Sequence, residues 1–215
     1  MWQSDTTYFL DNIFLCNYNR RCYEYSYYNI TYQTWYWFIG MNNVQIRDDV
    51  LTEEELKKLQ NVMLLDSTRN NKTVPWGISN MYESENDIMC EEKGAFFWTH
   101  TFHDRQRVES KYFDILFPLL DKINPRALVR IRANCNTITD RIIEHGYHTD
   151  VPEWTNCNTS IFYLNTNNGY TLFEEDGSKV QSVANRLCTF PCAVRHSSTT
   201  ATDVTQRVVI NFNYF

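Results

Sequence analysis

The spacing of hydrophobic and polar residues changes near residue 127. Residues 52–65 carry apolar side chains three or four positions apart, which predicts an amphipathic helix. Thr52 and Glu55 form a capping box and predict where this helix begins. The apolar positions of the helix are Leu56, Leu59, Val62 and Met63.

Three further elements are expected before residue 127. Residues 45–51 predict a short strand leading into the first helix, and residues 96–102 alternate weakly, as a strand does. Residues 109–123 show a second helical pattern, and Pro118 inside it should bend or split the helix. We therefore expect residues 45–126 to supply helical support for the part that follows.

After residue 127, short β-like runs recur between turns and no helical period intervenes. Asn167-Asn168-Gly169 and Asp176-Gly177 are typical of hairpin turns. This pattern predicts an antiparallel β sandwich or barrel over residues 127–215, with the two helices beside it. The predicted strands span 127–134, 160–165, 170–173, 186–190 and 206–214.

The first forty residues differ from the rest of the chain. They contain 14 of its 33 aromatic residues and have no clear helical period. We interpret residues 1–40 as an aromatic-rich extension, with one domain over residues 41–215. An aromatic docking surface and a membrane-interface patch are alternatives for this extension, and Met41 is an alternative start of the protein.

Length and charge restrict the class of protein. A chain of 215 residues suits one domain, and no run of 18 apolar residues predicts a membrane span. The net charge of −6 argues against a protein that coats nucleic acid, so a nucleic-acid partner is not expected.

The chain contains seven cysteines, an odd number with no C-x-x-C pair. We interpret them as reduced structural thiols, which favours a cytosol-like compartment. A disulfide, or a zinc half-site at Cys188 and Cys192, is the alternative.

Candidate chemistry lies in the β region. In an extended segment, His148 and Asp150 of the His-Thr-Asp tripeptide project to the same side, and His196 follows 46 residues later. Two imidazoles and one carboxylate on one face of a metal leave three positions open, as in non-haem Fe(II) oxygenases. Arg207 begins the last predicted strand, where its guanidinium can hold a carboxylate.

Strand parity adds further candidates. Arg207 and Asn211 share one face of the last strand, and Asn134 is in phase before the His-Thr-Asp loop. These asparagines either contact a cosubstrate or satisfy backbone groups. His145 has no carboxylate two residues later and is not expected to bind the metal.

The combined pattern resembles the iron(II)- and 2-oxoglutarate-dependent dioxygenases, in particular the prolyl 4-hydroxylase-like branch, with similar members in bacteria and their viruses. In two turns an asparagine stands where the family has glycine, at Asn168 and Asn185, and we expect asparagine to tolerate left-handed backbone there. The motifs are Tyr163-Leu164-Asn165, Asn168-Gly169-Tyr170-Thr171-Leu172-Phe173, Arg186-Leu187-Cys188-Thr189-Phe190-Pro191, His196 and Arg207.

The resemblance implies a double-stranded β-helix, a jelly-roll or cupin-like barrel. It implies that Fe(II) is bound by His148, Asp150 and His196, and that Arg207 and Tyr163 contact 2-oxoglutarate. It also implies O2 as a cosubstrate, with ascorbate as a further possible cofactor.

The implied activity is hydroxylation of an unactivated C–H bond, with release of succinate and CO2. The expected substrate is a peptidyl prolyl or similar side chain, or a small molecule. The expected location is the cytoplasm of a bacterium or of a virus-infected host cell. A cupin-like barrel that binds a metal or small ligand without oxygenase activity is the alternative. Residues 151–154 and 74–76 are candidate loops for substrate contact.

Overall fold

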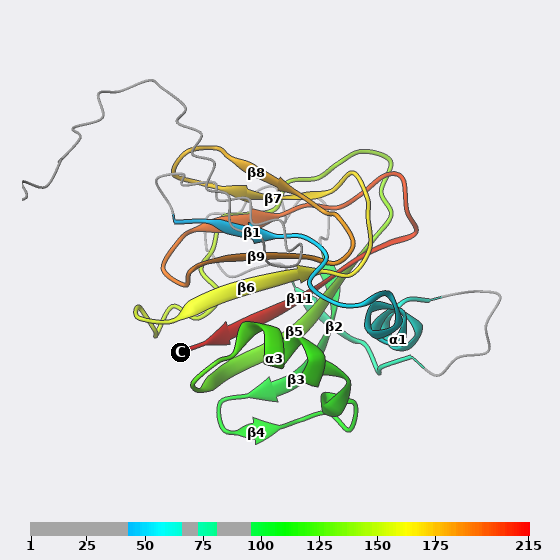
Figure 1. The fold of residues 1–215 in the computed structure, drawn as a ribbon. Helices are drawn as coiled ribbons and strands as arrows, with labels where there is room; N and C mark the ends of the chain where they lie inside the picture. The colour runs from blue at the N-terminus through cyan, green and yellow to red at the C-terminus, as the bar shows by residue number, and fades with distance from the viewer. Residues whose placement is uncertain (1–42, 66–72, 81–95) are drawn as a thin grey trace, which may run out of the picture. The chain divides into compact units, whose positions relative to one another are not determined.

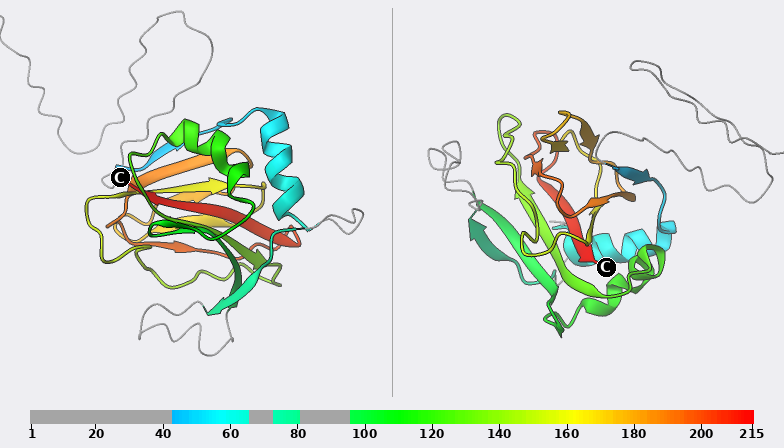
Figure 2. Two further views of the ribbon diagram at one scale, coloured as in Figure 1. Left: turned by 90° about the horizontal axis from the view of Figure 1, so that it is seen from below. Right: turned by 90° about the vertical axis from the view of Figure 1, so that its left-hand side faces the viewer.

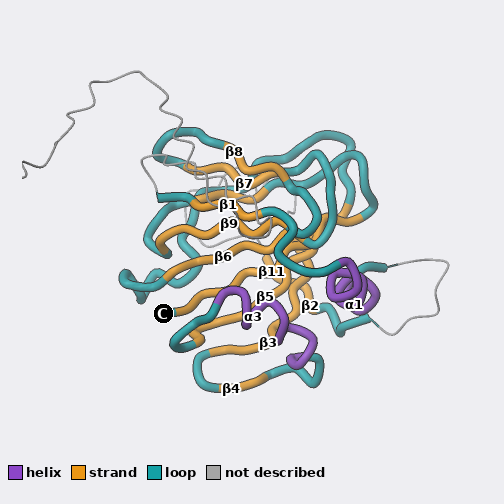
Figure 3. Tube along the Cα trace, viewed as in Figure 1, coloured by secondary structure: helices purple, strands orange, loops and turns teal. Residues whose placement is uncertain are grey.

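The computed structural model describes residues 43–65, 73–80 and 96–215, and strands are the main secondary structure of this part of the chain (Figures 1 and 3). The predicted extension over residues 1–40 and the alternative start Met41 lie outside the described residues. None of the helices in the described ranges combines the length and apolar content that a membrane crossing needs.

The larger of two antiparallel sheets has eight strands, with β11 near its middle. β11 is flanked by β5 and β6, and all nine of its residues are buried. The sheet order is β1 (Gln45–Arg47), β9 (Arg186–Pro191), β6 (Asn158–Tyr163), β11 (Gln206–Tyr214), β5 (Leu128–Thr137), β3 (Phe96–Asp104) and β2 (Gly77–Asn80), with β4 (Arg107–Val108) paired to β3.

The smaller sheet contains β10 (His196–Ser198), β7 (Tyr170–Phe173) and β8 (Lys179–Gln181) in that order. From β6 onward the chain passes from the larger sheet to β7 and β8, returns at β9, crosses to β10 and ends on β11. This alternation between two antiparallel sheets is the predicted double-stranded β-helix. Side chains of both sheets share one apolar cluster, which includes Ile161, Phe173, Phe190 and Val209.

The helices cover the other face of the larger sheet, as the left view of Figure 2 shows. α1 (Glu53–Met63) begins at the predicted capping box, with Thr52 as N-cap and Glu55 as its partner. A 3-10 turn, η1 (Phe113–Leu116), precedes α3 (Phe117–Ile123), and Pro118 lies in the first turn of α3. Proline is tolerated there because the first helical N–H groups have no partner within the helix, so the predicted split is confirmed.

The core between helices and sheet follows the predicted parity of the strands. On β11, Val208, Ile210 and Phe212 face this core, while the residues between them face the smaller sheet. Leu59 and Met63 of α1 are fully buried against the same face. The alternating pattern read from the sequence therefore separates an apolar core from a polar interior.

The predicted strands are confirmed with small shifts at their ends, and four short strands escaped prediction. β2, β4, β8 and β10 have only two to four residues each, too few for a periodic signal. The hairpin predicted at Asp176-Gly177 joins β7 to β8, and Gly177 has a φ of 66°. The hairpin predicted at residues 167–169 is wrong, because that turn carries the chain from one sheet to the other.

Asn185, in the turn before β9, adopts left-handed backbone as expected, with a φ of 68°. Its side chain is buried and makes two hydrogen bonds of 2.8 Å with the backbone of Leu51, donating to the carbonyl and accepting from the N–H. Asn168 is not among the described residues with positive φ, so its turn forms without left-handed backbone at this position.

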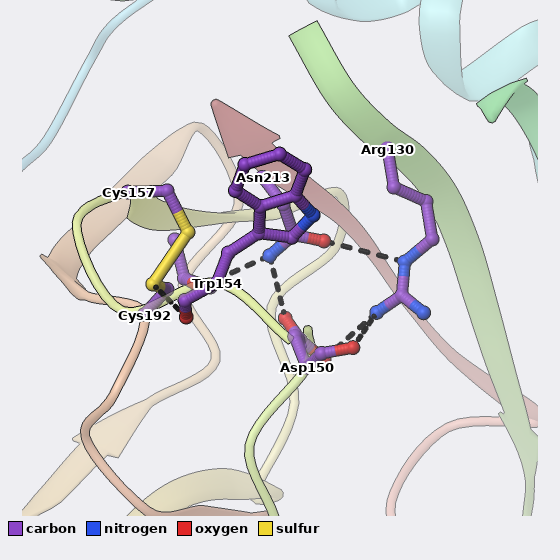
Figure 4. The surroundings of a disulfide bond; sticks show 7 residues. Arg130, Asp150, Trp154, Cys157, Cys192 and Asn213 are labelled. Atoms are coloured by element: carbon purple, nitrogen blue, oxygen red, sulfur yellow. Dashed lines mark hydrogen bonds and ion pairs between the residues drawn. A yellow bond between two sulfur atoms is a disulfide. The ribbon is translucent and has the colours of Figure 1, made fainter. Parts of the chain in front are cut away.

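A disulfide joins Cys157, just before β6, to Cys192, just after β9 (Figure 4). The two strands pair antiparallel, with Asn158 opposite Pro191, so the cysteines face each other at the end of the ladder. The expectation that all cysteines are reduced thiols is therefore wrong, and it no longer supports a cytosol-like compartment. Cys135 and Cys188 are buried free thiols, and burial raises the pKa of Cys188 to about 12.

Replacing Asn185 with alanine tests how the turn before β9 is stabilised. Asn185→Ala removes two buried hydrogen bonds and places a Cβ-bearing residue without a polar side chain in left-handed backbone. We expect the free energy of unfolding to fall by about 2–4 kcal/mol. Urea denaturation measures this loss, and Asn185→Gly should show a smaller one because glycine accepts the positive φ. Equal stability of wild type and Asn185→Ala would contradict the assignment.

Candidate metal centre and cavity

Three predicted ligands, His148, Asp150 and His196, come together at one position. His148 and His196 form an isolated antiparallel bridge, in which each N–H donates to the other's carbonyl at 2.9 and 3.0 Å. Asp150 lies two residues beyond His148 on the same segment. One donor atom from each of the three side chains lies within 4.8 Å of the others, a separation that one metal ion can bridge.

Both imidazoles are oriented by main-chain carbonyls. Nδ1 of His148 lies 3.2 Å from the carbonyl oxygen of Gly146, and Nδ1 of His196 lies 3.2 Å from that of Val194. A carbonyl only accepts hydrogen bonds, so each Nδ1 carries the proton and each Nε2 keeps a lone pair for a metal. Burial lowers the pKa of His196 to about 4, so this imidazole is neutral at pH 7.

Asp150 is a buried carboxylate with several polar neighbours (Figure 4). Asn213 Nδ2 donates to its Oδ2 at 3.2 Å, and Arg130 Nη2 lies 3.4 Å from its Oδ1. Burial alone would raise the pKa of Asp150. His196 in its protonated form, the charge of Arg130, His148 in its protonated form and the hydrogen bond from Asn213 outweigh this effect and lower the pKa to about 2. The group is therefore an anion at neutral pH, as a metal ligand must be.

A cavity of about 70 Å³ extends from the two histidines between strands of both sheets. Arg207 lies in its wall and is 1% exposed. Its Nε donates to Ser182 Oγ at 2.9 Å and its Nη1 to Ser198 Oγ at 3.0 Å, while Nη2 is buried with no partner among the described residues. Burial lowers the pKa of Arg207 to about 10, which leaves it charged at pH 7.

Gly169 gives Arg207 the space it occupies. A Cβ at Gly169 would lie 2.6 Å from Arg207 Cδ and 2.8 Å from the carbonyl oxygen of Thr200. One of these contacts is to backbone, so a side chain cannot be accommodated by moving Arg207 alone. The glycine of the motif is therefore required by the close approach of a side chain rather than by a positive φ.

Asn134 and Asn211 also line the cavity, on the faces that strand parity assigns to them. The Oδ1 atoms of both are buried without a hydrogen-bond partner in the described part of the chain. Asn211 Nδ2 lies 3.5 Å from Asp150 Oδ2, so its amide contacts the ligand set directly. These positions suit contact with a bound molecule, and the predicted cosubstrate role of both residues stays a prediction.

Tyr163 does not line the cavity but contacts a residue that does. Its hydroxyl donates to Thr171 Oγ1 at 2.7 Å, and Thr171, rather than Tyr163, is in the cavity wall. Burial raises the pKa of Tyr163 above its ordinary value, so the hydroxyl remains a donor. Its predicted contact with 2-oxoglutarate stays a prediction, and Thr171 is the hydroxyl placed to make that contact.

His145 lines the cavity but does not join the ligand cluster. Its Nε2 is buried without a hydrogen-bond partner among the residues that the structure describes. Burial, assisted by the charges of Arg207 and His148, lowers the pKa of His145 to about 3. The side chain is thus a neutral polar group facing the cavity.

An outer groove lies on the other side of the metal ligands. His148 and Arg132 line both the cavity and the groove, so the two spaces meet at these side chains. Residues 151–153 line the groove, as expected for a substrate loop, whereas Trp154 packs on Phe215 with ring centroids 5.2 Å apart. The expectation for residues 74–76 is wrong, because Val74 and Trp76 pack in the core beside the helices.

Sequence reasoning missed two polar residues beside Asp150. Arg130 is in phase with Asn134 on β5, and Asn213 is in phase with Arg207 on β11. The alternation of side chains along the strands therefore places both residues on the cavity side. Neither residue belongs to a recognisable motif, so the sequence did not single them out. His100 lies in the buried interior near Pro75 and Ser110, with contacts of 2.8 Å to each, and takes no part in the site.

No protein-family model matches the sequence, and neither does any curated protein. Solved structures do share the fold. An oxidoreductase of the 2OG-Fe(II) oxygenase family from Burkholderia pseudomallei matches with a TM-score of 0.56 and 15% identity, covering 80% of this chain and 84% of that one.

Two further solved structures share the fold. A prolyl hydroxylase from Trichoplax adhaerens, in complex with a hypoxia inducible factor peptide fragment, matches with a TM-score of 0.56 and 17% identity, covering 81% and 84% of the two chains. The epimerase SnoN, in complex with Fe3+, alpha ketoglutarate and nogalamycin RO, matches with a TM-score of 0.55 and 10% identity, covering 81% and 79%. These likenesses confirm the double-stranded β-helix, and the neighbours belong to the enzyme class that the motifs resemble.

The buried histidines predict how the stability of the metal-free protein depends on pH. The pKa values of His196 and His145 are about 4 and about 3 in the folded state, against 6.5 for the free side chain. Below pH 6.5 the unfolded chain binds more protons, so the free energy of unfolding should fall as the pH drops toward 4. Urea denaturation in chelator at pH 7, 6 and 5 measures this slope, and His145→Asn should reduce it. A slope unchanged by His145→Asn would contradict the burial of a neutral imidazole.

Proposed function

We propose that the protein is an Fe(II)- and 2-oxoglutarate-dependent oxygenase. One observation carries the proposal, namely that a His-Asp-His cluster and a buried arginine with an unpartnered Nη2 lie at one cavity. A barrel that only binds a metal has no need for a buried cation beside the metal site. Burying a guanidinium is costly unless it pairs with an anion, and 2-oxoglutarate provides a carboxylate for it.

The donor set suits Fe(II). His148 and His196 each turn Nδ1 to a carbonyl and leave Nε2 for a metal, and Asp150 offers one anionic oxygen; this set of two histidines and one carboxylate is typical of non-haem iron. Iron bound there supplies the redox chemistry that couples decarboxylation of 2-oxoglutarate to oxidation of a substrate by O2. The chain's own contribution is to fix three ligands on one side and leave the cavity side accessible.

Arg207 would hold the far carboxylate of the cosubstrate. Ser182 and Ser198 accept hydrogen bonds from Nε and Nη1 and fix the plane of the guanidinium, while Nη2 has no partner among the described residues. Thr171 and Asn134 line the same cavity and offer further polar contacts. 2-Oxoglutarate would then extend from Arg207 toward the histidines, with its other end at the metal.

We further propose a peptide substrate with a prolyl or similar side chain, bound in the outer groove. The groove meets the cavity at His148 and is bordered by residues 151–153, so a substrate there lies next to the metal ligands. The Trichoplax adhaerens neighbour is a prolyl hydroxylase in complex with a peptide, which supports this choice. A small-molecule substrate is the second candidate, because the SnoN structure contains nogalamycin RO.

Succinate release tests the proposed reaction. Wild-type protein supplied anaerobically with Fe(II), then given 2-oxoglutarate, O2 and a panel of proline-containing peptides, should form succinate. Asp150→Ala should reduce this below detection, because the site loses its only carboxylate. Asp121→Ala is a matched control, since Asp121 is an exposed acid on α3, outside the ligand cluster, the cavity and the groove. Succinate formation by Asp150→Ala at the wild-type rate would contradict the ligand assignment.

Arg207 variants test the cosubstrate site separately. Arg207→Lys should weaken 2-oxoglutarate binding, because a single ammonium cannot replace the hydrogen bonds to two serines and a carboxylate together. Arg207→Ala should weaken it further, by about 2–5 kcal/mol. Titrating 2-oxoglutarate into protein loaded with an inert divalent metal measures both, and metal affinity alone should change little. Unchanged 2-oxoglutarate affinity would instead favour a cupin-like barrel without oxygenase activity.

A further inference from the structure

Arg130 connects the main chain and the side chain of Asp150. Its Nη2 donates to the Asp150 carbonyl oxygen at 2.7 Å and lies 3.4 Å from carboxylate Oδ1. Its Nε donates to Asn213 Oδ1 at 3.3 Å. The guanidinium is 17% exposed, and Figure 4 shows it on the opposite side of the carboxylate from Asn213. Arg130 of β5 thus positions both the main chain and the carboxylate of Asp150.

The amide of Asn213 has only one orientation compatible with these contacts. Arginine is purely a donor, so the Asn213 atom facing Arg130 must be the oxygen. The Nδ2 group therefore faces Asp150 and donates to Oδ2 at 3.2 Å, and it also donates to Thr159 Oγ1 at 3.0 Å. Asn213 is fully buried, which keeps water from competing for these bonds.

The two carboxylate oxygens of Asp150 are consequently not equivalent. Oδ2 accepts from Asn213, with Asn211 Nδ2 a further 3.5 Å contact. Oδ1 is the oxygen within 3.8 Å of His148 Nε2, on the side of the imidazoles. A partial rotation about the Cβ–Cγ bond would move both oxygens away from these partners and break the hydrogen bond from Asn213.

We propose that Arg130 and Asn213 are positioning residues that hold Asp150 so that it binds the metal through Oδ1 alone. This inference rests on the proposed metal site. A carboxylate that binds through one oxygen occupies one coordination position, whereas binding through both would take a position needed for cosubstrate or O2. Outer partners of metal ligands commonly alter metal affinity by 10–100-fold when they are replaced.

Cobalt(II) provides a test that does not depend on turnover. We expect Arg130→Gln to lower Co(II) affinity by about 10-fold or more and to change the visible d–d spectrum of the bound ion. Arg130→Lys, which keeps the charge but not the fork, should fall between Arg130→Gln and wild type. A role in folding alone would lower thermal stability while leaving the Co(II) affinity and spectrum of the folded protein unchanged.

Arg186→Gln is the matched control. Arg186 pairs with Asp48 at 2.6 Å and its side chain is 19% exposed, close to the 17% of Arg130, but it is not in the ligand cluster or the cavity wall. This variant should retain wild-type Co(II) affinity. Should Arg130→Gln fail to fold, Asn213→Ala tests the same positioning from the other oxygen and should also weaken Co(II) binding.

The outcomes separate the two proposals. If wild-type protein does not bind Co(II), the proposed metal site itself is wrong. If wild type binds Co(II) and Arg130→Gln and Asn213→Ala bind it equally well with an unchanged spectrum, the metal site stands and the positioning role is overturned.

Discussion

The pairing of β11 with β5 on one side and β6 on the other is the constraint on which both halves of the structure depend. Side chains of a strand alternate between its faces, so this ladder sends Val208, Ile210 and Phe212 into the core beneath the helices. The same ladder sends Arg207 and Asn211 toward the smaller sheet. A shift of the register by one residue would bury the arginine in the apolar core and turn Val208, Ile210 and Phe212 toward the cavity.

The polar interior holds the buried anion Asp150, the half-buried cation Arg130 and the buried cation Arg207, and each is held in a different way. Asp150 is surrounded by donors, and its low pKa records that they outweigh the cost of burial. Arg130 pairs with it directly, whereas Arg207 is held by two neutral serine hydroxyls and has no anionic partner among the described residues. The first arrangement favours a stable ligand geometry. The second favours binding of an anion from outside, which is consistent with a cosubstrate that enters and leaves.

Much of this arrangement was predictable from the sequence because it follows from a period of two. The strands carrying Asn134 and Asn211, and the side of each strand that faces the cavity, follow from alternation alone. Predicting the ligand triad also required the His-Thr-Asp motif, because strand alternation does not say whether His145 or His148 lies beside His196. Tyr163 shows the limit of motif reasoning, because its hydroxyl donates to Thr171, a residue of the smaller sheet that faces it from the opposite sheet.

Other features had no local signal. β10 has three residues and follows a turn, yet it carries His196, so its pairing depends on β7 rather than on its own sequence. The roles of Arg130 and Asn213 depend on distances between side chains of different strands. The disulfide is similar, because its cysteines lie 35 residues apart and face each other only once β6 and β9 have paired.

That disulfide also shortens the path between the metal ligands. Along the chain, 46 residues separate Asp150 from His196, but the route through Cys157 and Cys192 is only about a dozen residues long. For a flexible chain, the entropy lost on bringing two points together grows with the logarithm of the intervening length, so the shorter route saves about 1 kcal/mol of loop-closure free energy. Once formed, the cross-link therefore lowers the conformational entropy that the chain loses when Asp150 and His196 are held side by side.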